Sequence, residues 1–189
     1  MIVYQVNCNQ GLLYQPKNLD RVRDEIFCGR PFPETWKQIE LLPRGDAATE
    51  DDFFGLGLKA LVCSEKAVTY CGQLWDEGEF LPVKIKGMKG KYFLYNITHC
   101  CSHLNPRKTR WQKDARTGEQ LIKSPAFYAE RLGEDCVFKI PEDGATAIYS
   151  LERDDVPGHE GLKTLAKRYG LTGLKFKLVW SDEAPPRRR

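Results

Sequence analysis

The stretch GLTGLKFKLVW at residues 170–180 carries the clearest structural signal of this 189-residue chain. From Leu174 onward its apolar side chains recur at every second position, with Lys175 and Lys177 between them. Side chains of a β-strand point alternately to the two faces of a sheet, so this spacing predicts a strand with one buried face. The residues that we expect to face the core are Leu174, Phe176, Leu178 and Trp180.

Shorter apolar or alternating segments predict the remaining strands. Residues 87–90 (GMKG) supply the turn of a hairpin between two of them. Residues 60–63 (ALVC) are apolar throughout and fit either a strand or the segment that leads into a helix. The other predicted strands span residues 1–6, 37–42, 81–85, 92–97, 136–140 and 145–151.

Two amphipathic helices are predicted from apolar residues at helical spacing. The first begins after Ser64, whose hydroxyl can accept a hydrogen bond from the first turn, and its apolar face extends to Trp75. The second covers residues 162–169 and ends at Gly170, because glycine suits the left-handed position after a helix. The elements together predict an α/β protein of the α+β type, with a single mixed or mainly antiparallel sheet and two or more packed helices.

Length and composition indicate one intracellular domain. We expect a single domain over residues 1–183, with residues 1–58 as an alternative N-terminal subdomain and a disordered tail at residues 184–189. The sequence shows no signal peptide and no apolar run long enough to cross a bilayer, which predicts a cytoplasmic protein. Its seven cysteines are an odd number without the regular spacing of a disulfide framework, so we expect free thiols.

Residues 99–103 (HCCSH) combine the imidazole and thiolate groups that zinc prefers. Adjacent cysteines at a strand end point to opposite sides, and the paired Cys-x-x-Cys spacing of many zinc sites is absent. We therefore expect a strand end with one buried cysteine and exposed histidines, and no metal, cofactor or catalytic residue. A small metal- or thiol-dependent enzyme stays open as an alternative, using His99, Cys100, Cys101 and His103.

Residues 107–113 (RKTRWQK) place cations beside an aromatic ring, as nucleic-acid-binding proteins do for phosphate contacts and base stacking. The net charge of the whole chain is only +3, which favours a solvated loop with Trp111 packed against the body. Arginine and tryptophan are also frequent anchors of protein interfaces, and long loops often carry them. The predicted partner-binding residues are Arg107, Arg110 and Trp111, with the acidic loop at residues 46–52 as the second candidate.

The order of five segments resembles a family of bacterial immunity proteins from polymorphic toxin systems, the eleventh immunity family. These segments are residues 64–67 (SEKA), 79–83 (EFLPV), 91–96 (KYFLYN), 137–140 (VFKI) and 170–176 (GLTGLKF). They cover the C-terminal two thirds of the chain with gaps, and the N-terminal third matches only through residues 27–31 and Trp36. Family members carry an aspartate where this chain has Asn105, and the HCCSH stretch is not part of the family pattern.

The resemblance implies a cytoplasmic protein that binds and neutralises a cognate bacterial toxin without catalysis. The expected partner is therefore the toxin protein, with no cofactor and no membrane. An inhibitor of this kind needs a stable scaffold with one complementary face, which suits a chain without a recognisable catalytic motif. A nucleic-acid-binding module that uses residues 107–113 is the remaining alternative.

Overall fold

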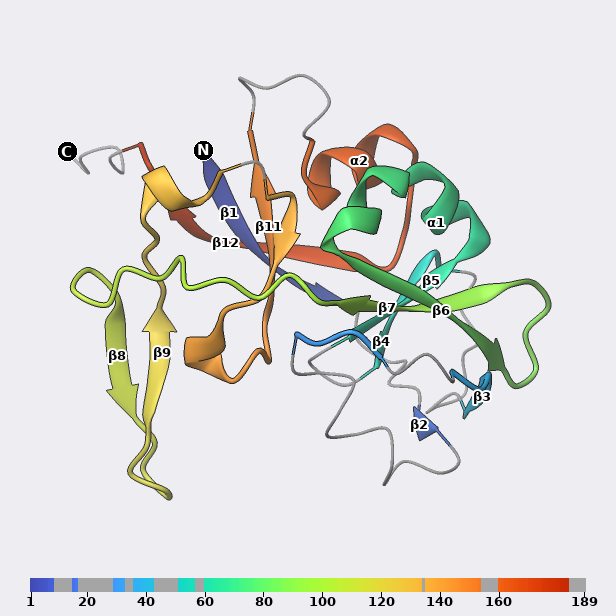
Figure 1. The fold of residues 1–189 in the computed structure, drawn as a ribbon, viewed down its shortest axis with the longest axis horizontal. Helices are drawn as coiled ribbons and strands as arrows, with labels where there is room; N and C mark the ends of the chain where they lie inside the picture. The colour runs from blue at the N-terminus through green and yellow to red at the C-terminus, as the bar shows by residue number, and fades with distance from the viewer. Residues whose placement is uncertain are drawn as a thin grey trace.

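A computed structural model shows the fold of the protein (Figure 1). The C-terminal tail at residues 184–189, the loop at residues 43–50 and His159 lie outside the residues that it describes. The described residues are 1–8, 15–16, 29–32, 36–42, 51–56, 60–133, 135–153 and 160–183.

The first sheet brings the two ends of the described chain together. Its four strands are all antiparallel, in the order β10 (Val137–Phe138), β11 (Ile148–Glu152), β1 (Ile2–Cys8) and β12 (Leu174–Ser181). The N-terminal strand β1 lies between β11 and β12, so it is an interior strand of the sheet. The predicted strands at residues 1–6, 136–140, 145–151 and 174–180 are therefore confirmed, with shifted ends.

The second sheet is mixed and has six strands. Their order is β2 (Gln15–Pro16), β3 (Ile39–Leu42), β6 (Gly78–Ile85), β7 (Tyr92–Ile97), β5 (Ala60–Ser64) and β4 (Phe53–Leu56). Only β3 and β6 run parallel, and the other neighbouring strands are antiparallel. Residues 60–63 belong to a strand, which decides between the two expectations for this segment.

A separate two-stranded ribbon consists of β8 (Arg110–Lys113) and β9 (Gln120–Ser124). The α-helices of the described residues are short: α1 covers Glu65–Tyr70 and α2 covers Leu162–Arg168. Within the described ranges, 3₁₀ turns lie at Gly72–Glu77, Ala129–Arg131 and Pro141–Asp143. The molecule is mainly β, and the expectation of a single sheet is wrong. Local alternation identifies strands, but it does not say which strands pair.

The main core lies where the inner faces of both sheets meet the two helices. Ala67 of α1 and Leu162 and Leu165 of α2 pack there against strand residues such as Val6 and Tyr95. The helices lie next to each other in Figure 1, and the rings of Tyr70 and Tyr169 stack with centroids 4.4 Å apart. Each sheet also carries apolar side chains on its outer face, which explains why segments such as residues 60–63 are apolar throughout.

The last strand differs from its predicted pattern. In the pairing of β1 with β12, Val6 lies opposite Phe176 and Tyr4 lies opposite Leu178. The next residue of β1, Val3, lies opposite Trp180, so β12 has one extra residue at this point and its alternation is interrupted there. Trp180 therefore points to the opposite face from Phe176. It packs there against the apolar cluster on the outer face of the four-stranded sheet, which we call the outer core of that sheet. Leu178 keeps the face of Phe176 but is 58% exposed, so its predicted burial is wrong.

The helix ends follow the expected chemistry. The Ser64 hydroxyl accepts a hydrogen bond from the backbone N–H of Ala67 at 3.1 Å, as an N-cap does. Gly170 follows α2 with φ of +58°, a left-handed value that glycine adopts without strain. The first helix is shorter than its apolar face predicted, because the chain tightens into a 3₁₀ turn after Cys71.

Two further findings bear on the class of protein. No helix among the described residues has the length and apolar character needed to cross a membrane. The six cysteines of the described residues are all free thiols, in agreement with the expectation from the cysteine pattern.

Candidate functional site

The basic segment predicted as a long loop forms the β8–β9 ribbon. At its start the Asn105 side-chain oxygen accepts hydrogen bonds from the backbone N–H groups of Arg107 and Lys108, at 3.2 and 3.3 Å. At its tip Asp114 accepts two more backbone N–H groups, at 2.7 and 2.9 Å, and closes the turn between the strands. These local bonds define the turns at the base and at the tip of the ribbon.

The three predicted partner-binding residues share this ribbon and its base, in two different environments. Arg107 and Arg110 are both exposed. The Trp111 ring is half-buried against the outer core of the four-stranded sheet, and its Nε1 donates a hydrogen bond to the Pro106 carbonyl at 3.3 Å. Trp111 therefore anchors the ribbon to the body, whereas the arginines face solvent.

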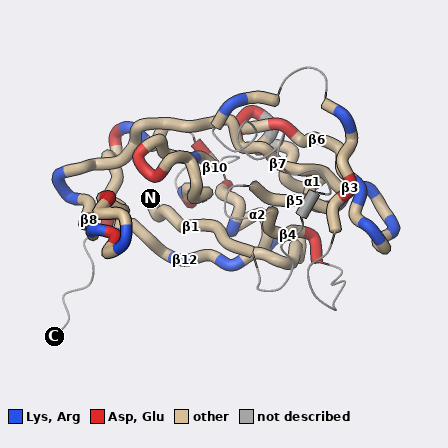
Figure 2. Tube along the Cα trace, turned by 90° about the horizontal axis from the view of Figure 1, so that it is seen from below, with Lys and Arg blue, Asp and Glu red and all other residues tan. Residues whose placement is uncertain are grey.

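The ribbon concentrates the positive charge of the chain. Residues 105–124 hold six basic and two acidic side chains, a net charge of +4 against +3 for all 189 residues. The rest of the chain is thus close to neutral. Figure 2 shows these basic positions gathered around β8 at one end of the molecule. The side chains concerned are Arg107, Lys108, Arg110, Lys113, Arg116 and Lys123, with Asp114 and Glu119 among them.

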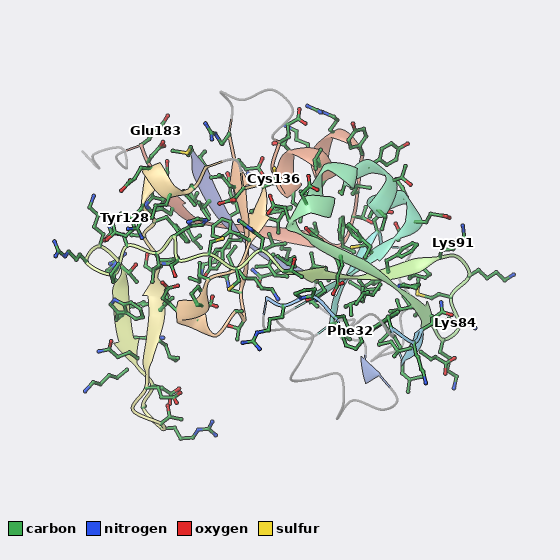
Figure 3. All side chains as sticks on the ribbon, in the orientation of Figure 1. Phe32, Lys84, Lys91, Tyr128, Cys136 and Glu183 are labelled. Carbon is green, nitrogen blue, oxygen red and sulfur yellow. The ribbon has the colours of Figure 1, made fainter. Side chains whose placement is uncertain are left out.

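A groove of about 400 Å³ lies at the base of the ribbon. Lys108 lines it together with Tyr128 and Trp180, and Tyr128 is labelled beside the ribbon in Figure 3. Glu130 and Asp182 also line it, so the groove is of mixed charge and holds two partly exposed aromatic rings. Tyrosine and tryptophan are frequent anchors of protein interfaces.

A second cluster of chemical interest surrounds the side chain of Asp135. Its two carboxylate oxygens lie 2.6 Å from His99 Nε2 and 2.7 Å from His103 Nε2. The Cys101 Sγ lies 3.1 Å from His99 Nε2. Glu77 completes the group, with one carboxylate oxygen 3.9 Å from His99 Nδ1. These five side chains include two overlapping sets that could hold a metal ion.

The backbone holds this cluster between the end of β7 and the start of β10. Residues 99–101 run beside Lys139, whose N–H donates to the His99 carbonyl and whose carbonyl accepts from the Cys101 N–H, both at 2.9 Å. The other Glu77 carboxylate oxygen accepts the N–H of Cys136 at 3.0 Å. Cys136 directly follows Asp135 and marks this region near the middle of the molecule in Figure 3.

Burial and charge set the protonation of the cluster. Burial raises the pKa of Asp135, but the contacts of its carboxylate with His103 and His99 lower that pKa by more, to about 2. The same contact with Asp135 raises the pKa of His99. Burial and the nearby carboxylates raise the pKa of the Cys101 thiol to about 11.

This arrangement does not fit the thiol-dependent enzyme considered above. A nucleophilic cysteine needs a lowered pKa and a base that is oriented through its second ring nitrogen. Here the same nitrogen of His99 faces both Cys101 and Asp135, and the pKa of Cys101 is raised. The cluster therefore lacks the geometry of a Cys-His-acid triad.

The expectation of exposed histidines in this stretch is wrong. The His103 side chain is only 12% exposed and that of His99 is 31% exposed. The His103 N–H donates a hydrogen bond to the Cys101 carbonyl at 2.9 Å, which turns the chain at Ser102. Ligand atoms of His99, Cys101 and His103 lie within 4.8 Å of one another, whereas Cys100 lies against Gly29 and is not in this group.

Sequence reasoning missed Asp135 and Glu77, which come from distant parts of the chain. Asp135 lies 36 residues after His99, and no local pattern connects the two.

The acidic segment at residues 46–52, the second candidate for partner binding, is only partly described by the structure. Residues 46–50 of it lie outside the described residues, and Asp52 is a buried structural residue, 8% exposed.

No protein-family model matches the sequence, and no curated protein matches it. The resemblance to immunity proteins therefore remains an expectation that depends on the order of its five segments.

Proposed function

We propose that the protein is an immunity protein that neutralises a cognate bacterial toxin by binding it, without catalysis. The order of the five segments supports the family, and the β8–β9 ribbon supports the mode of action. An inhibitor must present a rigid and chemically distinct surface to its target, and the ribbon is such a surface.

The observation that carries this proposal is the concentration of charge on a preformed ribbon. The net charge of +4 over residues 105–124 predicts a target with an acidic face. Complementary charge speeds encounter and selects the partner, and affinity then depends on a few well-packed anchors. Arg107 and Arg110 are the proposed charged contacts, and the groove lined by Tyr128 and Trp180 is the proposed site for an apolar anchor of the toxin.

The orientation of Trp111 favours a protein target over nucleic acid. Proteins that bind single strands stack bases on exposed aromatic faces. Trp111 instead packs against the outer core of the four-stranded sheet. Its ring is therefore not free to stack on a base beside the cations of the ribbon. The Tyr128 ring at the base of the ribbon is itself covered by the Arg131 guanidinium, 4.4 Å from the ring centroid. These two arrangements favour an acidic protein surface over the stacking of bases.

Co-expression tests the proposed function. Each gene next to this one is expressed in bacterial cells with and without the chain, and growth is followed. We expect one neighbour to be toxic alone and harmless in the presence of this protein. Toxicity that the chain does not relieve, or a complete absence of toxic neighbours, would contradict the proposal.

Calorimetry with that neighbour then tests the ribbon. The double variant Arg107→Ala, Arg110→Ala is expected to lose about 2 kcal/mol of binding free energy, roughly 30-fold in Kd. The matched control is Lys84→Ala, Lys86→Ala, which removes two exposed cations at the end of β6. Lys84 is labelled at the opposite end of the molecule from the ribbon in Figure 3. Equal affinity of the two variants would move the interface away from the ribbon. Binding of oligonucleotides at low salt, weakened by the ribbon variant alone, would favour the nucleic-acid alternative.

A further inference from the structure

We propose that His99, Cys101, His103 and Asp135 form a structural binding site for a divalent zinc ion. Their ligand types are those of known zinc centres, and four protein ligands are typical of a closed structural site. Ligand atoms of His99, Cys101 and His103 lie within 4.8 Å of one another, and the Asp135 carboxylate touches both rings.

The spacing of the ligand atoms is close to what zinc requires. Tetrahedral Zn–N and Zn–O bonds of about 2.0–2.1 Å place neighbouring ligand atoms about 3.3 Å apart, and a Zn–S bond of about 2.3 Å places sulfur and nitrogen about 3.6 Å apart. The observed separations are 2.6 and 2.7 Å between Asp135 and the two histidines, and 3.1 Å between Cys101 and His99. Each of these three pairs would therefore separate by about 0.5–0.7 Å around a bound ion.

The His103 ring shares its carboxylate partner with His99. Its Nε2 is buried and lies 2.7 Å from Asp135 Oδ2, while the other oxygen of the same carboxylate lies 2.6 Å from His99 Nε2. Two imidazole nitrogens and a carboxylate thus converge on one point, and a cation between them would be coordinated by all three groups.

The surroundings of His99 match those of a metal-binding histidine. Such a ring commonly directs its second nitrogen at a carboxylate, which fixes its orientation. With Nε2 facing the site, the Glu77 carboxylate lies on the Nδ1 side of the ring at 3.9 Å, which is longer than a hydrogen bond but places a carboxylate where such a partner stands. Glu77 is held in turn by the N–H of Cys136, next to Asp135. A thiolate and a carboxylate also balance the two positive charges of the ion, with the Cys101 proton released to solvent.

The proposed ion would connect two segments that are distant in sequence. Residues 99–103 follow β7 of the six-stranded sheet, and Asp135 precedes β10 of the four-stranded sheet. Zinc bound here would cross-link the two sheets where the chain passes from one to the other. This role is independent of toxin binding, because the ribbon lies outside the cluster.

Cobalt substitution tests the site, since tetrahedral Co²⁺ replaces zinc and reports thiolate ligation as a charge-transfer band in the near ultraviolet. We expect the untagged full-length protein to bind about one equivalent of Zn²⁺ and to show this band with Co²⁺. Cys101→Ser should abolish the band and weaken Zn²⁺ binding roughly 100-fold or more. The matched control is Cys100→Ser, which replaces the neighbouring thiol outside this group and should leave both unchanged.

A third variant keeps the test decisive if Cys101→Ser does not fold. Asp135→Asn retains the thiol and the shape of the side chain, and it should retain the band while weakening Co²⁺ binding at least 10-fold. Absence of the band at stoichiometric Co²⁺ in the parent protein would overturn the proposal. Equal loss of the band in the Cys100 and Cys101 variants would also overturn it.

Discussion

At the scale of single residues, Asp52 shows how one buried carboxylate can connect three parts of the chain. It accepts hydrogen bonds from the Ser64 hydroxyl at 2.8 Å, the Lys66 ammonium at 3.1 Å and the Thr172 N–H at 3.1 Å. The start of β4, the N-cap of α1 and the turn before β12 therefore meet at one side chain. The composition of the acidic loop suggested a solvated surface, but burial gives Asp52 a structural role.

We expect Asp52→Ala to lower the free energy of unfolding by about 2–3 kcal/mol, because it removes the shared acceptor of three part-buried hydrogen bonds. Asp52→Asn should lie between this variant and the parent, since an amide oxygen still accepts some of these bonds. The exposed Asp76 serves as the control, and Asp76→Ala should change stability by less than about 0.5 kcal/mol. Urea denaturation measures all three, and equal effects at both positions would refute the structural role of Asp52.

At the scale of elements, β12 shows that alternation in sequence does not guarantee burial. Phe176 packs partly into the main core, with its ring edge-on to Tyr4 at 6.3 Å, whereas Leu178 on the same face is 58% exposed. We expect Phe176→Ala to cost about 2–3 kcal/mol of stability, slightly less than for a fully buried ring, and Leu178→Ala less than about 0.5 kcal/mol. Equal losses in chemical denaturation would mean that the register of β12 is different.

The same contrast explains what could be predicted from the sequence. The strand at residues 81–85 was predictable because its apolar side chains alternate locally, and the strand at residues 92–97 because the turn at residues 87–90 predicts its hairpin partner. The ribbon was not, because its exposed strands bury little beyond Trp111 and Ile122 and so show no apolar face. Only part of the cluster around Asp135 could be predicted. His99, Cys101 and His103 are close in sequence, but their contact with Asp135 depends on how distant segments pair, which no local pattern encodes.

At the scale of the whole molecule, two strands connect the three apolar clusters into one unit. Val3 and Val6 of β1 pack into the outer core of the four-stranded sheet and the main core, respectively. In β5, Leu61 packs into the main core and Val62 packs into the apolar cluster on the outer face of the six-stranded sheet. A strand with both faces buried cannot leave one core without disrupting the other, so we expect the two sheets to unfold together.

Two substitutions at opposite ends of this arrangement test that cooperativity. Val3 and Val62 are both fully buried, and each change to Ala should cost about 2 kcal/mol through lost burial and cavity formation. Because the sites lie in different cores, their effects should add to within about 0.5 kcal/mol in the double variant. Circular dichroism and tryptophan fluorescence should report one coincident urea transition for all variants. Two separate transitions, with Val62→Ala moving only one of them, would show instead that the sheets are independent folding units.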